Sequence, residues 1–540
     1  MATTVTPQGT VSLCKTQLEN DYKNQLTFSN ATAQHNYFAS TVQYTQNDCT
    51  YIKQDNVLYF DKNIDQIRTC NYLFYKNTGF TNKWFYCFIT RMEYENENCT
   101  AVYFETDVFQ TWQFDISYKR CFVEREHVNN DTFGLHTVPE NFELGELTCN
   151  DVNRLAYADL NLNVLLVMAI NKPLSPLTDN ANTHMYGGVF SGLYYVAFHT
   201  PQDCAKCINQ LDGAGQGAVI ENIFILPNKL LNINSWSTIY IPPASASDTF
   251  EISAISNSNN PVRIIKDTIV TRNTTIDGYT PKNRKLFCWP FNYMFATNNG
   301  GQQAVFHYED FANGNGDFDI VGTIAPGGSI RMIPRNYKNL GDDTDATACN
   351  TYGLTGAKYP TCAWVNDAYT NWLTQNAVNL QISLASSYAL VGIGAISTAM
   401  GNPMGIMDIA SGAMEIADDL KQMHQAEFMP NQANGNANSG DIQYSAHMMQ
   451  FDVYQMSIKS EYAKIIDNYF TMFGYKVSTV KIPNITGRSN WNYVKTIDCN
   501  CDGNIPQEDL NKIKNMFNAG VTLWHNASTM LDYSQSNNIV

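Results

Sequence analysis

The first half of the chain alternates apolar and polar residues, with the period of two that is typical of half-buried strands. Trp84, Tyr86 and Phe88 alternate with the residues between them, and Val102 and Phe104 do so after a polar turn at residues 95–98. Two aromatic and β-branched runs joined by a polar turn are typical of a β-hairpin. Short runs of the same kind recur over residues 219–270. The pattern therefore predicts a β-rich first half.

After residue 365 the apolar residues recur with a helical period. Residues 368–407 contain no Asp, Glu, Lys, Arg or His, and apolar residues fill every side of the predicted helix. Gly401, Asn402 and Pro403 then end this helix and begin another, because Gly ends helices and Pro suits their first turn. The pattern predicts an αα-hairpin with its bend at these three residues.

The residues around this bend form the principal candidate functional segment. They are Leu390, Val391, Ile393, Ile396, Met400, Gly401, Pro403, Met404, Ile406, Met407 and Ile409. Asp408, Glu415, Asp418 and Asp419 lie on the polar side of the second helix. Composition alone favours a hairpin buried in a protein core. The alternative is conditional insertion into a membrane, since two helices of about 20 residues each reach about 30 Å.

Two further helices are expected towards the C-terminus. Residues 442–473 place Met448, Phe451, Ile458, Tyr462, Ile465, Tyr469 and Met472 at helical spacing, and Gly474 follows as a C-cap. A final helix is expected between Pro506 and Gly520. The Asn- and Gly-rich stretch between the αα-hairpin and the first of these helices, residues 428–441, is predicted to be a flexible linker.

Composition and charge narrow the function classes. A chain of 540 residues can hold two or more domains, and its 16% of charged residues leaves a polar but weakly ionic surface. The formal net charge is −16, and the sequence contains no run of Lys and Arg of the kind that binds the phosphate backbone of nucleic acids. The fourteen Cys show no disulfide spacing, so we expect buried thiols, for example at Cys87, Cys121 and Cys288 in strand-like runs.

Three motifs suggest a chemical site, and we favour a structural reading of each. Cys204 and Cys207 have zinc-like spacing without a second ligand pair, which favours a loop. Asp498, Asn500, Asp502 and Asp509 fall at calcium-loop positions, but no helix is expected to lead into them, which favours a surface turn. On a strand, Glu124 and Glu126 share one face while His127 points away. We therefore expect no catalytic residues, no metal and no cofactor.

Two blocks of sequence resemble a known protein family. They are "FETDVFQTWQFDISYKRCFVEREHVNNDTFGLHTVPENFELGE" at residues 104–146 and "EYAKIIDNYFTMFGYKVSTVKIPNITGRSNWNYVKT" at residues 461–496, the latter continuing to residue 525. Both are similar to the distal tail tube, or tail knob, proteins of small short-tailed bacteriophages of the phi29-like type. The blocks are colinear and lie far apart, so the resemblance covers the overall frame of the chain.

The resemblance implies a structural protein of the virion, located at the distal tip of the tail and without enzymatic activity. It implies a hexameric ring whose apolar loops close the tube and later penetrate the host cell membrane for genome ejection. The partners implied are further copies of the chain, the proximal tail tube or lower collar, a cell-wall hydrolase at the tip, the host membrane, and viral DNA passing through the lumen unbound. On this basis membrane insertion becomes the favoured role of the hairpin, and its four acids become candidate pore-lining residues.

The expected fold class is α+β and mainly β, with tail-tube-like β domains and long apolar helical loops before a C-terminal helical segment. The expected segments are a tube domain at 1–150, a second β-rich part at 151–365, the plug loop at 366–441 and a C-terminal part at 442–540. A tail-tip receptor-binding protein is the alternative function, and a tail-associated hydrolase is a third.

Overall fold

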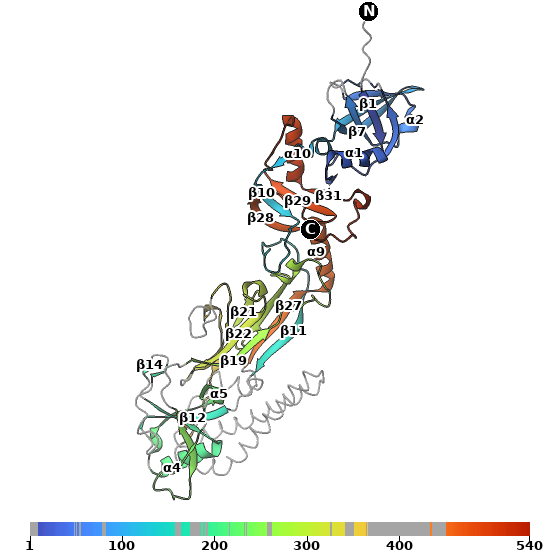
Figure 1. Ribbon diagram of the computed structural model, residues 1–540. Coiled ribbons are helices and arrows are strands. Elements are labelled where there is room, and N and C mark those ends of the chain that lie inside the picture. The colour runs from blue at the N-terminus through green and yellow to red at the C-terminus, as the bar shows by residue number, and fades with distance from the viewer. Residues whose placement is uncertain are drawn as a thin grey trace, which may run out of the picture. The chain divides into compact units, whose positions relative to one another are not determined.

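The computed structural model describes residues 9–365, 433–434 and 450–540. The gaps within the first range are residues 48, 50, 53–55, 78–82, 157–163, 173–184, 187–188, 191–192, 215, 232, 234, 256–261, 324–326, 341–349 and 363. The described chain is mainly β, as the sequence predicts, with few helices (Figure 1).

The chain divides into two compact units, each built from separated segments. Unit 1 comprises Met1–Gly145, Gly278–Leu286 and Ser460–Val540, and unit 2 comprises Glu146–Asp277 and Phe287–Lys459. This division differs from the linear segments expected from the sequence, because residues 278–286 leave the middle of the chain and join unit 1. Composition does not indicate that residues 278–286 belong to unit 1, because contacts between residues far apart in the sequence place them there.

A seven-stranded antiparallel sheet forms the N-terminal part of unit 1. Its strand order is β3-β1-β6-β7-β8-β5-β4. The strands are β1 (Gly9–Cys14), β3 (Val42–Gln46), β4 (Tyr51–Ile52), β5 (Val57–Phe60), β6 (Tyr72–Asn77), β7 (Phe85–Asn96) and β8 (Cys99–Thr106). The predicted hairpin is confirmed, because β7 and β8 pair directly around a short turn. Helices α1 (Ala31–Ser40), α2 (Ile64–Ile67) and α3 (Val108–Trp112) accompany this sheet.

A five-stranded sheet in the order β2-β31-β29-β10-β28 joins the two ends of the chain within unit 1. Its strands are β2 (Asn24–Leu26), β10 (Cys121–Glu126), β28 (Tyr475–Lys481), β29 (Trp491–Ile497) and β31 (Val521–Trp524), and a small ladder pairs β9 (Ser117–Tyr118) with β30 (Cys501–Asp502). The final helix is confirmed as α10 (Gln507–Ala519), with Pro506 as N-cap and Gly520 as C-cap. Buried Trp491 and Trp524 lie 5.1 Å apart between ring centroids and share a core with residues of the first sheet, such as Tyr72.

The expected helix over residues 442–473 is wrong in its first half. Residues 450–458 form strand β27 (Gln450–Ile458), and only α9 (Ser460–Phe473) is helical. Phe451, Val453, Gln455 and Ser457 alternate along β27 and are all buried, and β27 pairs with β11 on one side and β20 on the other. The expected apolar face of the helix is also displaced, since Ile465 is 67% exposed and Ile466 is buried instead.

The described residues of unit 2 include three sheets of four or five strands. The first, in the order β11-β27-β20-β21, contains β11 (Leu147–Ala156), β20 (Asn292–Thr297) and β21 (Gln303–Phe306) beside β27. The second, β19-β22-β23-β24, contains β19 (Val262–Val270), β22 (Gly316–Thr323), β23 (Ser329–Pro334) and β24 (Leu354–Lys358). The third, β16-β12-β15-β18-β17, contains β12 (Val164–Ile170), β15 (Tyr194–Phe198), β16 (Ile220–Pro227), β17 (Ser237–Ile239) and β18 (Phe250–Ala254).

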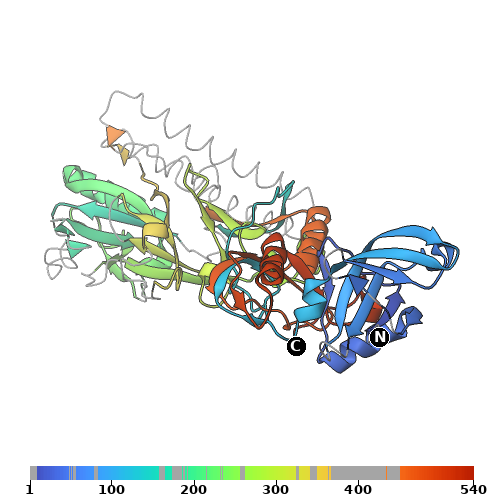
Figure 2. The same ribbon diagram turned by 90° about the horizontal axis from the view of Figure 1, so that it is seen from above.

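Smaller elements complete unit 2. They are helix α4 (Pro201–Gly213), helix α5 (Asn228–Leu231), and the two-stranded ladders β13 (Met185–Tyr186) with β14 (Val189–Phe190) and β25 (Trp364–Val365) with β26 (Ala433–Asn434). Figure 2 shows the whole ribbon from above.

Candidate functional site

The candidate membrane segment lies between β25 and β26 in the sequence, and these two short strands pair with each other. β25 and β26 pair antiparallel, with Trp364 opposite Asn434 and Val365 opposite Ala433. The eleven apolar residues from Leu390 to Ile409 and the four acids from Asp408 to Asp419 lie outside the described residues. Within the described residues, no helix is long and apolar enough to cross a membrane.

The chain leading into this ladder is fixed to the five-stranded sheet of unit 2. The Ile225 amide donates a 2.9 Å hydrogen bond to the carbonyl of Pro360, and the Cys362 amide donates one of 2.7 Å to the carbonyl of Ile223. Phe224 and Thr361 form an antiparallel bridge between these two bonds. The residues before the ladder therefore extend this sheet beyond its edge strand β16.

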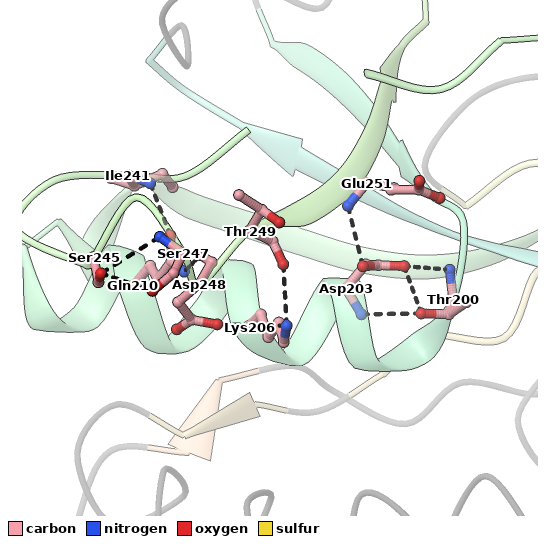
Figure 3. A network of polar contacts seen from close by, with 10 residues as sticks. All are labelled: Thr200, Asp203, Lys206, Gln210, Ile241, Ser245, Ser247, Asp248, Thr249 and Glu251. Carbon is pink, nitrogen blue, oxygen red and sulfur yellow. Dashed lines mark hydrogen bonds and ion pairs between the residues drawn. The ribbon is translucent and has the colours of Figure 1, made fainter. Parts of the chain in front are cut away.

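Helix α4 packs against the same sheet, and local capping fixes its start. Thr200 and Asp203 form a capping box, in which the Thr200 hydroxyl accepts from the Asp203 amide and the Asp203 carboxylate accepts from the Thr200 amide (Figure 3). The other Asp203 carboxylate oxygen accepts a 3.0 Å bond from the Glu251 amide on β18. Farther along the helix, the Gln210 side chain donates to the carbonyl of Asp248 and accepts from the Ile241 amide (Figure 3).

Cys204 and Cys207 lie on this helix, which corrects the loop expected for them. Both side chains are buried in the core between the helix and the sheet. Burial raises the pKa of both thiols well above its ordinary value, so both are protonated at neutral pH. Cys87, Cys121 and Cys288 are also buried free thiols, as expected, although Cys288 follows a 3-10 turn and is not part of a strand.

Three of the four residues at calcium-loop positions have separate structural partners. Asp502 forms a 3.5 Å ion pair with Lys119, and Asp509 accepts a 2.8 Å hydrogen bond from the Trp112 indole. The Asn500 amide reaches the carbonyl of Arg120, and Asp498 adopts a positive φ of 53° at a turn. No three His, Cys, Asp or Glu side chains of the described residues are grouped so that they could hold a metal ion.

A β-bulge changes the expected arrangement of Glu124, Glu126 and His127. The register of β10 shifts between Val123 and Arg125, so Glu124 and Glu126 do not share one environment. The Glu124 side chain is 33% exposed and lies 2.9 Å from Lys495, whereas that of Glu126 is fully buried and pairs with Lys481. His127 is also buried, and its ring bonds only to backbone groups of Thr471 and Tyr493. These groups therefore serve packing and pairing.

Sequence reasoning missed a buried ionic cluster that holds residues 278–286 within unit 1. Asp467, fully buried on α9, accepts from the Tyr279 hydroxyl at 2.7 Å and from the amides of Lys282 and Asn283 at 2.8 and 3.0 Å. Glu140 is also buried and pairs with Lys285 at 2.6 Å and with Arg125. Asp467 occupies an apolar face of α9, and this is the one sequence signal that could have indicated a buried carboxylate with partners.

Comparisons with known proteins identify relatives that match nearly the whole chain. The family model described as Bacillus phage phi29, tail knob protein gp9, C-terminal domain, matches residues 251–538. A second model, the Caudoviral major tail protein N-terminus, matches residues 8–118. The tail knob protein gp9 of Bacillus phage B103 is 29% identical over 96% of each chain, and that of Bacillus phage phi29 is 26% identical over 98% of each chain.

A solved structure has the same fold. The tail knob protein gp12 of bacteriophage C1 superposes with a TM-score of 0.65 over 98% of this chain and all of that one, at 15% identity. Because the phi29 gp9 model spans more than half of the sequence and both gp9 relatives align over nearly its whole length, this chain belongs to the family of phi29-like tail knob proteins, non-enzymatic structural components of the virion tail.

Proposed function

We propose that this tail component forms a ring of six copies at the distal end of the tail, closed by the segment around residues 389–409. On infection the segment leaves the lumen and enters the host cell membrane, which opens a passage for the viral DNA. The uncharged composition of residues 368–407, unlike that of the rest of the chain, is the observation that carries the proposal.

The described residues on either side support this role. The segment starts and ends at the β25–β26 ladder, and the preceding residues are bound to β16. An insertion with both ends at one place can change its surroundings without breaking the sheets of unit 2. In the closed ring the apolar side chains bury one another, and a bilayer then offers the same surface a second apolar environment.

Charge is consistent with a passage for DNA. The formal net charge of −16 suits a lumen along which DNA slides without binding. Asp408, Glu415, Asp418 and Asp419 would face the aqueous side of the opened passage. The proximal tail tube or lower collar and a cell-wall hydrolase at the tip are the neighbouring virion proteins under this proposal.

Dye release from anionic liposomes tests the proposal, measured from neutral to mildly acidic pH. We expect release by the full chain and none by a chain lacking residues 380–430. A point variant, Ile393→Glu with Ile396→Glu, keeps the length of the segment. It should suppress release at least tenfold, since each central charge costs about 3 kcal/mol of insertion free energy.

The matched control is Ile269→Glu, at a strand position of unit 2 that is 61% exposed, and it should release dye like the unmodified chain. Equal release by all four proteins would refute membrane insertion by this segment. No release by the full chain at any pH, with aggregation of the deletion variant, would identify the segment as core. The protein would then act as a tube or a receptor binder.

A further inference from the structure

Three exposed apolar side chains lie in a row across the five-stranded sheet of unit 1. Phe122 on β10 is directly opposite Val480 on β28 and Ile497 on β29. Residues opposite one another on neighbouring strands point to the same side of a sheet. These side chains are 36%, 54% and 50% exposed respectively. We call Phe122, Val480 and Ile497 the apolar row.

The apolar row is on the side of the sheet that faces away from α10. Val494 shares a buried core with Ile513 and Phe517 of α10, and the Thr496 hydroxyl donates to Asn518. Ile497 follows Thr496 directly and therefore points to the other side. One side of the sheet is thus covered by its own helix, while three large apolar groups on the other side remain in water. Contiguous exposed apolar groups of this kind mark contact surfaces.

The edge of this sheet is protected against strand addition, so the contact would involve the face. β28 is the outermost strand, but the Arg120 guanidinium donates a 3.2 Å bond to the carbonyl of Val480. At its other end, the Lys476 amide donates to Glu140, and Lys285 reaches the carbonyl of Lys476. Ser478 between them has a positive φ of 44°, which interrupts the extended backbone. Such features block edge-to-edge pairing.

The charges beside the apolar row favour an acidic partner. Glu124 is paired with Lys495 and Glu126 with Lys481, which leaves these pairs neutral. Arg120 is exposed and, among the described residues, forms no ion pair with a carboxylate. The apolar row therefore has a cation beside it, in a chain whose formal net charge is −16.

The chain itself carries a surface of matching chemistry at the tip of the β7–β8 hairpin. Tyr94 there is 56% exposed, and Glu95 and Glu97 are also exposed. Neither carboxylate forms an ion pair with a described residue. In Figure 1, β7 lies in the sheet at one end of unit 1 and β28 lies in the sheet at the other end. Two different, complementary surfaces on one subunit give head-to-tail contacts, which form a ring when the rotation between neighbouring copies closes.

We propose that the apolar row with Arg120 receives the acidic tip of the β7–β8 hairpin, Tyr94, Glu95 and Glu97, of a second copy of this chain. The inference rests on the ring of the proposed function and assigns the contact that builds it. Tyr94 would cover the apolar row, and Arg120 would pair with the carboxylates at its rim, which is the usual distribution of apolar core and polar rim in an interface.

Sedimentation velocity of the full chain over a range of concentrations tests this contact. The variant Phe122→Thr, Val480→Thr, Ile497→Thr keeps strand propensity and changes only exposed side chains. We expect its association constant to fall by about tenfold or more. The control variant Ile269→Thr, Val305→Thr changes exposed strand positions of unit 2 and should associate like the unmodified chain.

Charge reversal identifies the partner surface. Arg120→Glu should weaken association, and adding Glu95→Arg with Glu97→Arg in the same chain should restore it. Failure of this rescue overturns the pairing with the hairpin tip. Normal rings from the threonine variant overturn the role of the apolar row but leave the ring itself intact. An unmodified chain that stays monomeric at every concentration overturns the ring and the contact together.

Discussion

Burial shifts the pKa values of two ionisable residues of unit 1 in opposite directions. Asp107 caps α3 by accepting from the amides of Phe109 and Gln110, and its other oxygen accepts from the Tyr72 hydroxyl. Burial nevertheless raises the pKa of this carboxyl to about 7. Burial also lowers the pKa of the His127 imidazole to about 3, so this ring is neutral near neutral pH. Between these limits the folded state holds a proton on Asp107 and none on His127.

Replacing Asp107 with Asn should reveal the cost of ionising it. The folded pKa lies above the unfolded value of 3.8, so the contribution of Asp107 to stability is full at low pH and is lost as the pH rises through about 7. Relative to the unmodified protein, Asp107→Asn should gain about 1.4 kcal/mol of unfolding free energy per pH unit between about pH 4 and pH 7. Urea unfolding across this range measures the difference.

Asp61→Asn, at an exposed aspartate, provides the matched control over the same pH range. A constant difference between Asp107→Asn and the unmodified protein would mean that Asp107 is ionised throughout this range in the folded state.

At the scale of elements, single positions locate helix ends well but do not decide between a strand and a helix. Gly474 marks the C-terminal end of α9, and Pro506 and Gly520 mark the two ends of α10, as the sequence predicts. Residues 450–458 fit a helical spacing and still form β27, because pairing with β11 and β20 satisfies their backbone groups in extended form. The sequence of residues 450–458 cannot predict this pairing, because β11 and β20 are both far from it along the chain.

Gly474→Ala should be strongly destabilising because two costs coincide there. The residue has a φ of +65°, and an added Cβ would lie 2.1 Å from the carbonyl oxygen of Glu126. We expect a loss of at least about 3 kcal/mol of unfolding free energy from strain and displacement together. Urea unfolding monitored by circular dichroism measures it.

Gly278→Ala separates the two costs. Gly278 also has a positive φ, of +78°, but an added Cβ there meets nothing within 4 Å. Only the backbone term of about 1 kcal/mol should remain. If both variants lost the same stability, contact with Glu126 would not constrain Gly474.

At the scale of the whole molecule, strands from opposite ends of the sequence hold each unit together. β2 pairs with β31, and β10 pairs with β28 and β29 in unit 1. In unit 2, β27 pairs with β11 and β20, which precede it by long stretches of chain. We therefore expect that the fold does not depend on an unbroken backbone between residues 366 and 449.

A chain cut in this interval should keep its fold. With a protease site inserted between Asn436 and Ala437, the two fragments should remain together in native gel filtration after complete cleavage, because the ladders of both units span the cut. The same sample in denaturant provides the control and should separate. Separation under native conditions would show that the remote ladders cannot hold the fragments.

The sequence by itself determined the features that depend on local chemistry. The β7–β8 hairpin, the C-terminal end of α9, both ends of α10, the burial of Cys87, Cys121 and Cys288, and the family all follow from residues close together along the chain. The tertiary structure decided which residues share an environment: the conversion of residues 450–458 to a strand, the bulge that separates Glu124 from Glu126, and the transfer of residues 278–286 to unit 1. These features arise because partners from distant segments supply the hydrogen bonds and charges that buried groups require, and no local pattern encodes those partners.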